Sequence, residues 1–239
     1  MKTKPYSDQI ALVTGGGTGI GRAFTEALAT AGTKVVIASR REEILSHTAH
    51  ELNLNFGAER VFPYAFDIRE RREVDALVGY VIQRWGALDI LINNSGLAVP
   101  ETVDQITEEG WDKVMDTNLR GVMQLVRSIL PHMIANEFGD IVNISSQAGK
   151  HGYADVPSYC ASKFGLLGYA ESLRDHVRKA DANIRVFNFC PGLVDVENGA
   201  PDAAPRPGFI HASNMARTLM YALSLDRSVI LEDINLYAR

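Results

Sequence analysis

The sequence has few cysteines, no long hydrophobic run and no excess of positive charge. Only Cys160 and Cys190 are present in 239 residues, too few for a disulfide framework and without the spaced partners of a metal site. No segment approaches the roughly 18 uninterrupted apolar residues of a membrane helix. The formal net charge of -5 leaves no broad basic surface for nucleic acid. We therefore expect a soluble, cytoplasmic protein that binds a small molecule, and neither a membrane nor nucleic acid.

The length of the chain suits one domain. A chain of 239 residues can bury a substantial core but is short for two independent domains. No internal repeat or low-complexity linker divides it, so residues 1–239 are predicted to form a single domain. The stretch rich in Pro, Gly and Ala within residues 195–210 is predicted to be a surface loop or substrate lid.

Short runs rich in β-branched residues alternate with longer stretches of helical periodicity. In one such stretch the apolar residues Val74, Leu77, Val78 and Val81 share one helical face. Nearly continuous apolar strands joined by helix-length crossovers indicate a parallel sheet that is covered on both faces. The predicted fold is a doubly wound α/β sheet of about seven strands, at residues 10–14, 34–39, 60–66, 88–93, 140–145, 184–190 and 228–237.

A glycine-rich turn follows the first strand directly. Gly15, Gly19 and Gly21 have the spacing G-x-x-x-G-x-G and lead into a helix. Glycines permit a tight turn and close backbone approach, so pyrophosphate oxygens can bind the free N–H groups at the positive end of the helix. A plain glycine-rich turn is the alternative, but the strand, turn and helix context favours a dinucleotide site, which would also include Gly17, Thr18 and Ile20.

The end of the second strand indicates which dinucleotide is bound. An acidic residue there would bind the ribose 2′-hydroxyl of NAD, whereas this chain has Ser39, Arg40 and Arg41. A guanidinium can hold a 2′-phosphate through two parallel hydrogen bonds, so NADP(H) is favoured over NAD(H). Alternatively, Ser39 and Glu42 form a helix capping box that leaves both arginines in solvent.

Tyr159 and Lys163 lie one helical turn apart in a predicted helix at 158–179, which Pro157 would start. The spacing alone is weak evidence, but the chemistry is specific. A phenol with a pKa of about 10 exchanges protons poorly near neutral pH. An ammonium at about 4 Å in a dielectric of about 20 would favour phenolate by about 4 kcal/mol. Lys163 is therefore predicted to lower the pKa of Tyr159 to about 7.

Six ordered motifs together resemble the short-chain dehydrogenase/reductase family over nearly the whole chain. They are the glycine turn, "NNSG" at 93–96, the asparagine of "DTNLRG" at 116–121, "ISS" at 144–146, "YCASK" at 159–163 and "PG" at 191–192. The resemblance implies a Rossmann-type fold and hydride transfer between NADP(H) and a small ketone or secondary alcohol. It also implies a homotetramer or homodimer, with helices at about 111–136 and 158–179 in the interface.

The resemblance implies a role for each catalytic residue. Tyr159 would be the acid/base, Lys163 would also hold the nicotinamide ribose, and Ser146 would bond the substrate oxygen, with Ser145 as its close competitor. Asn118 would hold a water that links Lys163 to solvent, although an exposed helix residue is the simpler alternative.

The remaining expected cofactor contacts come from the strand ends. In the family an aspartate at the position of Asp67 contacts the adenine amino group, although Asp67 and Glu70 also form a possible capping box. The other expected cofactor residues are Ile68, Asn94, Ser95, Gly96, Pro191, Gly192 and Val194. Cys160 adjoins Tyr159, but it faces about 100° away and is predicted to be a packing thiol.

The substrate side is less well defined by the residues. His151, Tyr153 and Leu193 are predicted to line the pocket with Ser146, or the first two are ordinary loop residues. Val196 stands where the family has a threonine that bonds the nicotinamide carboxamide, so we expect an altered cofactor contact.

Charge in the predicted lid gives a further hypothesis. The lid would carry more negative than positive charge and so disfavour a strongly anionic substrate, because it contains Asp195, Glu197 and Asp202 but only Arg206 as a basic residue.

Two other functions remain as alternatives. The first is a dinucleotide-binding regulator or scaffold with little turnover, which the intact catalytic residues disfavour. The second is a sugar epimerase or dehydratase of the related extended fold, which the short chain and the glycine spacing disfavour.

Overall fold

The structure is a computed structural model and describes residues 3–196 and 206–239. Within these ranges the main sheet has seven parallel strands in the order β3-β2-β1-β4-β5-β6-β9. This arrangement confirms the predicted doubly wound α/β fold. The strands are β1 (Ile10–Thr14), β2 (Lys34–Ser39), β3 (Val61–Ala65), β4 (Ile90–Asn93), β5 (Gly139–Ile144), β6 (Ile184–Pro191) and β9 (Asp233–Leu236).

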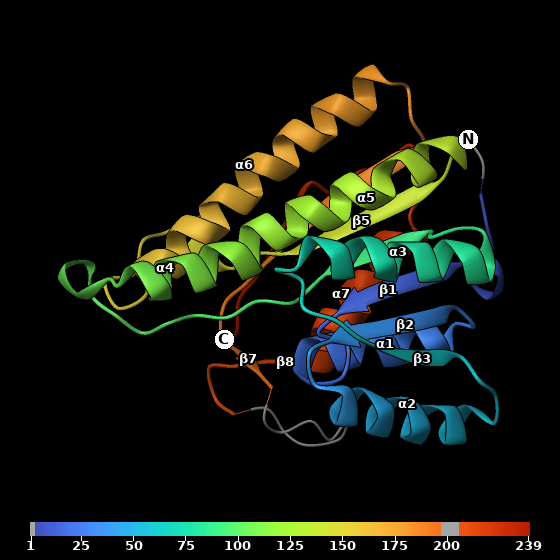
Figure 1. Cartoon of the computed structure of the whole chain (residues 1–239), viewed down its shortest axis with the longest axis horizontal. Helices are drawn as coiled ribbons and strands as arrows, with labels where there is room; N and C mark the ends of the chain where they lie inside the picture. The colour runs from blue at the N-terminus through green and yellow to red at the C-terminus, as the bar shows by residue number, and fades with distance from the viewer. Residues whose placement is uncertain (1–2, 197–205) are drawn as a thin grey trace.

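Helices cover both faces of this sheet (Figure 1). One face packs against α1 (Gly19–Thr30), α2 (Glu42–Phe56) and α7 (Ala212–Ser224), and the other against α3 (Arg71–Trp85), α5 (Gly121–Ala135) and α6 (Pro157–Lys179). Each face has its own apolar core, centred on residues such as Phe24 and Leu45 on one side and Leu77 and Leu125 on the other. Among the helices of the described residues, none is long and apolar enough to span a membrane.

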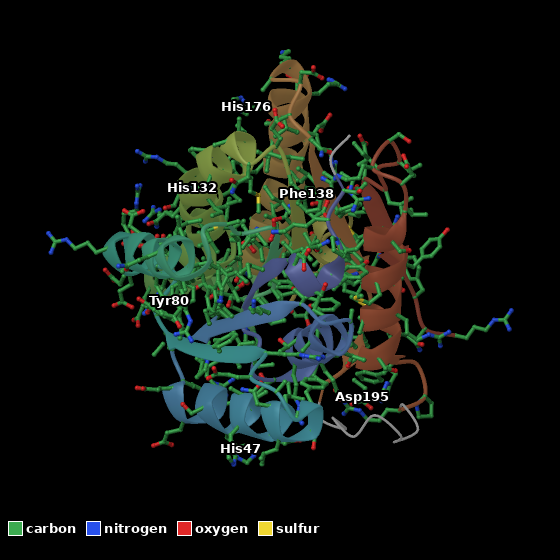
Figure 2. All side chains as sticks on the ribbon, turned by 90° about the vertical axis from the view of Figure 1, so that its right-hand side faces the viewer. His47, Tyr80, His132, Phe138, His176 and Asp195 are labelled. Atoms are coloured by element: carbon green, nitrogen blue, oxygen red, sulfur yellow. The ribbon has the colours of Figure 1, made fainter. Side chains whose placement is uncertain are left out.

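The strand order changes direction between β1 and β4, the neighbours from which the two halves of the sheet extend outward. In such sheets a crevice forms outside the carboxyl ends of the strands at this point, because the crossovers leave in opposite directions. A small parallel pair, β7 (Val194–Asp195) and β8 (Ile210–His211), lies near this end. Figure 2 shows Asp195 at one end of the molecule and His176, near the end of α6, at the other.

The last strand is shorter than predicted. The sequence suggested a strand over 228–237, but β9 covers only Asp233–Leu236. A turn occupies the preceding segment, in which the amides of Ser228 and Val229 donate to the side chain and the carbonyl of Asp226. β9 pairs with β6 from Asn188 onward, where the Asn188 amide donates to the Glu232 carbonyl, and within the described ranges residues 228–231 have no strand alongside.

Candidate active site

The glycine turn between β1 and α1 needs glycine for geometric reasons. Gly15 and Gly19 have φ angles of +67° and +53°, in the left-handed region that favours glycine. A Cβ on Gly21 would lie 2.3 Å from the carbonyl oxygen of Gly15, far inside van der Waals contact. The turn is therefore as tight as the dinucleotide prediction requires, and it opens at the carboxyl end of the sheet.

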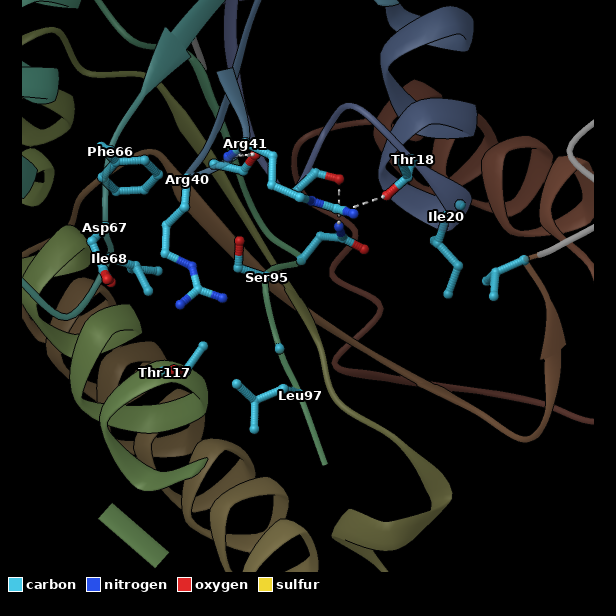
Figure 3. A pocket seen from close by; sticks show the side chains of 16 residues that line it. Thr18, Ile20, Arg40, Arg41, Phe66, Asp67, Ile68, Ser95, Leu97 and Thr117 are labelled. Atoms are coloured by element: carbon cyan, nitrogen blue, oxygen red, sulfur yellow. Dashed lines mark hydrogen bonds between the residues drawn. The ribbon is translucent and has the colours of Figure 1, made fainter. Parts of the chain in front are cut away.

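A cleft of about 400 Å³ runs along the carboxyl ends of β1, β2, β3 and β4 (Figure 3). Twelve of the residues predicted to bind the cofactor line it: Gly15, Thr18, Gly19, Ile20, Ser39, Arg40, Arg41, Asp67, Ile68, Asn94, Ser95 and Gly96. Gly17 lies in the same turn but packs beside Ile44 and Leu45 of α2, outside the cleft lining. Phe66, Leu97, Thr117 and Val196 complete the lining. Phe66 and Thr117 had been overlooked, although each adjoins a predicted residue.

Both arginines after β2 face the cleft. Figure 3 shows Arg40 reaching toward the region between Asp67, Ser95 and Thr117, and Arg41 turned toward Thr18. The Arg41 Nη2 lies 3.5 Å from the Thr18 Oγ1. The structure places two guanidiniums where the sequence analysis expected a phosphate to bind.

The two capping boxes proposed as alternatives do not form. Helix α2 begins at Glu42 with Arg41 at the N-cap, and the Ser39 hydroxyl only accepts a long bond of 3.4 Å from the Arg41 amide. Helix α3 begins at Arg71 with Glu70 at the N-cap, so Asp67 lies too far from the helix to cap it. The sequence pattern was satisfied, but both helices start later than the capping rule assumed.

Asp67 is instead held by Arg69. The Arg69 Nε and Nη2 donate to the carboxylate at 3.0 and 2.6 Å, and the Arg69 amide donates to the same group. The hydrogen bond from the Arg69 side chain is the main reason why the pKa of Asp67 lies below its ordinary value, and Arg40 adds to this effect. The carboxylate therefore stays charged and faces the cleft in a fixed orientation.

Thr14 supports the turn from beneath and was missed by the sequence analysis. Its hydroxyl accepts hydrogen bonds from the amides of Asn94 and Ser95 at 3.0 and 2.9 Å. The Asn94 side chain in turn donates to the Thr14 carbonyl at 2.9 Å. These bonds join the ends of β1 and β4, the two strands that flank the crevice. No local sequence signal indicates this role, because the partners are 80 residues apart.

Tyr159 and Lys163 lie on the first turns of α6, which starts at Pro157 as predicted. The Lys163 Nζ is 5.4 Å from the centre of the Tyr159 ring. Lys163 is only 4% exposed, and its Nζ donates to the Ile144 carbonyl at 2.7 Å. The two side chains therefore meet at the carboxyl end of β5.

Ser146 and Ser145 take different directions after β5. The Ser146 hydroxyl lies on the Tyr159 side, where it lowers the pKa of the phenol in part, and it accepts from the Ala148 amide at 3.1 Å. The buried Ser145 hydroxyl points to the backbone carbonyl of Lys163 at 3.4 Å. Ser146 is thus the serine on the Tyr159 side, as the spacing had suggested.

The predicted lowering of the Tyr159 pKa is wrong for this structure. Burial raises the pKa of the phenol above its ordinary value, the Ser146 hydrogen bond lowers it in part, and Cys160 raises it slightly. The loss of solvent around both groups outweighs the attraction between the phenolate and the Lys163 charge. The same burial lowers the pKa of Lys163 to about 8.

Asn118 is buried in a π-helical turn, η3 (Asp116–Arg120), between α4 (Glu108–Met115) and α5. Its Oδ1 accepts from the Leu97 amide at 2.9 Å, and its Nδ2 donates to the Leu97 carbonyl and to the Ser162 hydroxyl. The alternative of an exposed helix residue is therefore wrong. Asn118 joins the loop after β4 to α6.

A second cavity, of about 420 Å³, surrounds the Tyr159 and Lys163 end of the cleft. Its lining includes Ser146, Leu193 and the predicted cofactor residues Pro191, Gly192 and Val194. His151 and Tyr153, which were predicted to line the substrate pocket, are exposed and do not contribute to this lining. The buried Cys160 accepts a hydrogen bond from the Tyr153 amide at 3.3 Å, so this thiol anchors the loop that carries them.

The start of the predicted lid is partly described. The Val196 side chain packs against the turn, since a Cβ on Gly19 would lie 3.2 Å from it. Asp195 is 1% exposed and paired with Arg206 at 3.1 Å, so its charge does not face a substrate as the lid hypothesis assumed. Glu197 and Asp202 lie outside the described residues.

The family model for short chain dehydrogenases matches residues 9–206. The chain therefore belongs to the short chain dehydrogenase family of oxidoreductases. One curated relative is a 3-oxoacyl-acyl-carrier-protein reductase of Thermotoga maritima, 33% identical over 78% of this chain and 74% of the relative. Another is a probable NADP-dependent dehydrogenase of Haemophilus influenzae, 36% identical over 77% of this chain and 70% of the relative.

Solved structures agree with the fold over almost the whole chain. An actinorhodin polyketide ketoreductase with NADPH is 29% identical, with a TM-score of 0.85 over 99% of this chain and 97% of that chain. A short chain dehydrogenase/reductase from Burkholderia phymatum in complex with NAD is 27% identical, with a TM-score of 0.86 over 98% of this chain and 90% of that one.

The glycine turn can be tested by adding one methyl group. We expect Gly21→Ala to destabilise the fold by about 1–3 kcal/mol, because the new Cβ collides with the Gly15 carbonyl. Gly79→Ala on α3 is the control, since nothing lies within 4 Å of its Cβ and alanine should stabilise the helix by about 0.5–1 kcal/mol. Urea unfolding measures both, and equal effects would show that the turn tolerates a side chain.

Proposed function

We propose that the protein is an NADP(H)-dependent oxidoreductase that interconverts a small ketone and its secondary alcohol, with Tyr159 as the acid/base. One observation carries the proposal. Ser146, Tyr159 and the buried Lys163 line a cavity that shares wall residues, Asn94 and Gly96 among them, with the cleft formed by the tight glycine turn and two arginines. Hydride transfer needs both a proton donor and a dinucleotide site in one continuous space.

The residues of the cleft fit a dinucleotide. The turn at Gly15–Gly21 leaves no room for a Cβ at Gly21, and at Gly96 an added Cβ would lie 3.5 Å from the Lys163 Nζ. The free backbone N–H groups at the N-terminus of α1 would bind the pyrophosphate. Ile68 and Asp67 would hold the adenine, and Lys163 and Tyr159 the nicotinamide ribose.

The charge at the end of β2 supports NADP(H) over NAD(H). Arg40 and Arg41 both face the cleft, and Thr18 lies within 3.5 Å of Arg41. Two guanidiniums favour the doubly charged 2′-phosphate that distinguishes NADP. The curated relative named for NADP dependence and the ketoreductase with NADPH support the same preference, while the structure with NAD shows that the family uses both.

The proton side of the reaction follows from three side chains. A bound reduced nicotinamide would supply the hydride to the carbonyl carbon. The hydroxyls of Ser146 and Tyr159 would donate hydrogen bonds to the carbonyl oxygen and so stabilise the charge that develops there. Tyr159 would then give its proton to the alkoxide, and the ammonium of Lys163 would stabilise the phenolate that remains. Asn118, which is hydrogen-bonded to Leu97 and Ser162, would hold a water that carries protons between Lys163 and solvent.

The walls of the cavity around Tyr159 and Lys163, the reacting end of the site, favour a neutral substrate. Leu97, Leu193, Val194 and Val196 are apolar, and among the described residues that line this cavity Lys163 is the one with a charged side chain. Lys163 is turned to the Ile144 carbonyl, so the described part of this cavity has no other charged side chain to hold a carboxylate. A small uncharged ketone or secondary alcohol suits this pocket best.

Several expectations remain predictions. A single domain, a lid at 195–210, a cytoplasmic location and a homotetramer or homodimer come from the sequence and the family resemblance. For the oligomer, Trp111 of α4 and Phe164 of α6 are exposed aromatic residues on the helices expected at the interface. The alternative of a regulator or scaffold gains no support from the site, because Ser146, Tyr159 and Lys163 are assembled together.

Removal of the phenolic hydroxyl is the direct test of the proposal. We expect Tyr159→Phe to lower kcat for ketone reduction by about 10²- to 10⁴-fold, the usual contribution of a positioned acid. NADPH binding, followed by nucleotide fluorescence, should persist. Unchanged turnover would refute the role of Tyr159, and a wild-type protein that binds NADPH but reduces no ketone or aldehyde in a broad panel would favour the regulator.

The pH dependence of ketone reduction should follow Lys163. Its pKa of about 8 means that the ammonium is present below that pH and is lost above it. Because the phenolate left by proton donation needs this charge, kcat should be flat near neutral pH and fall as pH rises through about 8. Tyr159, whose pKa is raised, stays protonated over the same range. A pH profile at saturating NADPH measures this, and a rate that rises through this range would contradict it.

The cofactor preference can be tested at the end of β2. We expect Arg41→Ala to raise the KM for NADPH by about 10- to 100-fold, because a charge-assisted bond to the 2′-phosphate is lost, while the KM for NADH stays the same. Arg72→Ala, an exposed arginine on α3, is the matched control. Equal loss with both cofactors would mean that Arg41 supports the fold of the turn and does not select the phosphate.

A further inference from the structure

The 3-10 turn η4 (Gln147–Gly149) begins directly after Ser146, and the C-terminal segment holds it in place. Gln147 is 5% exposed, and both ends of its side-chain amide are used. The Nε2 donates to the Cys190 carbonyl at 2.6 Å, and the Oε1 accepts from the Tyr237 hydroxyl at 2.6 Å. Because a carbonyl can only accept, the orientation of the amide is determined and the Tyr237 hydroxyl must be the donor.

The same contacts join three segments that meet at the reacting end of the cleft. Cys190 lies near the end of the buried strand β6 and precedes Pro191 and Gly192, which line the cavity around Tyr159. The Gly192 amide donates to the Leu236 carbonyl at 2.9 Å, immediately before Tyr237. One glutamine side chain therefore links the Ser146 turn, the Pro-Gly loop and the C-terminal segment.

A second contact holds the other end of η4. The Lys150 Nζ pairs with the Asp233 carboxylate at 2.9 Å, and Asp233 is also bonded by Asn188 and Arg174. Both ends of the turn after Ser146 are thus attached to β9 and the residue that follows it.

We propose that Gln147 and Tyr237 are positioning residues that set the Ser146 hydroxyl against the Tyr159 phenol, and that the C-terminal segment is therefore part of the catalytic apparatus. This inference rests on the proposed function only for its kinetic readout. Neither residue lines the cavity of the reacting end, so they act through Ser146 and through the loop at 191–192. A small displacement of a catalytic group is sufficient to lower the rate.

An exposed tyrosine near the end of a chain can also be simple surface packing. Tyr237 is 67% exposed, yet its hydroxyl reaches a buried amide 90 residues away in the sequence. Tyr221 on α7 is a matched control because it is 62% exposed and, among the described residues, its hydroxyl makes no side-chain hydrogen bond. Phenylalanine at either position removes one hydroxyl and keeps the ring.

The test compares Tyr237→Phe with Tyr221→Phe in the full chain. For Tyr237→Phe we expect kcat for ketone reduction to fall about fivefold, the effect of one lost hydrogen bond, with the KM for NADPH and the melting temperature little changed. The alkaline limb near pH 8 belongs to Lys163, which neither variant alters, so it should stay in place in both variants. Tyr221→Phe should match the wild type in every measurement.

Hydrogen exchange provides a readout that does not need turnover. We expect faster exchange of the amides at 145–150 in Tyr237→Phe and no change in Tyr221→Phe, because the Ala148 amide is held by Ser146. Gln147→Leu should show the larger effect, and the double variant with Tyr237→Phe should be no worse than Gln147→Leu alone.

The results separate the two proposals. Unchanged exchange at 145–150 together with unchanged kcat in Tyr237→Phe overturns the positioning role. A loss of kcat that merely parallels a lower melting temperature, with exchange at 145–150 unchanged, also overturns it. If the wild type reduces no ketone, the proposed function fails, and the exchange data alone decide whether the Tyr237 contact holds the Ser146 turn.

Discussion

The site depends on the burial of one ammonium group. Lys163 is almost fully enclosed, and its Nζ reaches the Ile144 carbonyl at the end of β5. Burying a charge is costly unless hydrogen bonds compensate, and the cost here lowers the pKa of Lys163 to about 8. Gly96 packs beside it, since an added Cβ would lie 3.5 Å from the Lys163 Nζ, and Asn118 holds the neighbouring Leu97 in place. Lys163 is therefore mainly charged at neutral pH and loses its proton as pH rises through about 8.

Long-range hydrogen bonds among polar residues position the groups around that lysine. Thr14 joins the ends of β1 and β4, Asn118 joins the loop after β4 to α6, and Gln147 joins the turn after β5 to the C-terminal segment. A ladder of amides, from Asn93 through Asn143 to Asn188, crosses three neighbouring strands beneath them. Buried amides of this kind are stable only when their partners are present, so they fix the relative position of the strands as well as their own.

Much of the fold could be predicted from the sequence because it depends on local patterns. β1 and β2 begin and end at the predicted residues, and α6 begins at Pro157 because proline is well suited to the first helical turn. The capping boxes predicted at Ser39 and Asp67 do not form, because loop residues separate the ends of β2 and β3 from the first residues of the helices, Glu42 and Arg71. The strand predicted at 228–237 was too long, because apolar character at Val229 and Ile230 does not show whether a neighbouring strand lies alongside.

The sequence by itself determined the order of strands and helices, the glycine turn, and the presence of Ser146, Tyr159 and Lys163 at their spacing. These features depend on backbone geometry and on neighbours within one helical turn, which the sequence states directly. Only the tertiary structure decided the electrostatics and the supports of the site. Burial raises the pKa of Tyr159 where the pair of charges alone suggested a lower one, Asp195 is paired inside the protein, and Tyr237 reaches Gln147. Desolvation and contacts between distant residues depend on how the layers pack, and no local pattern of residues contains that information.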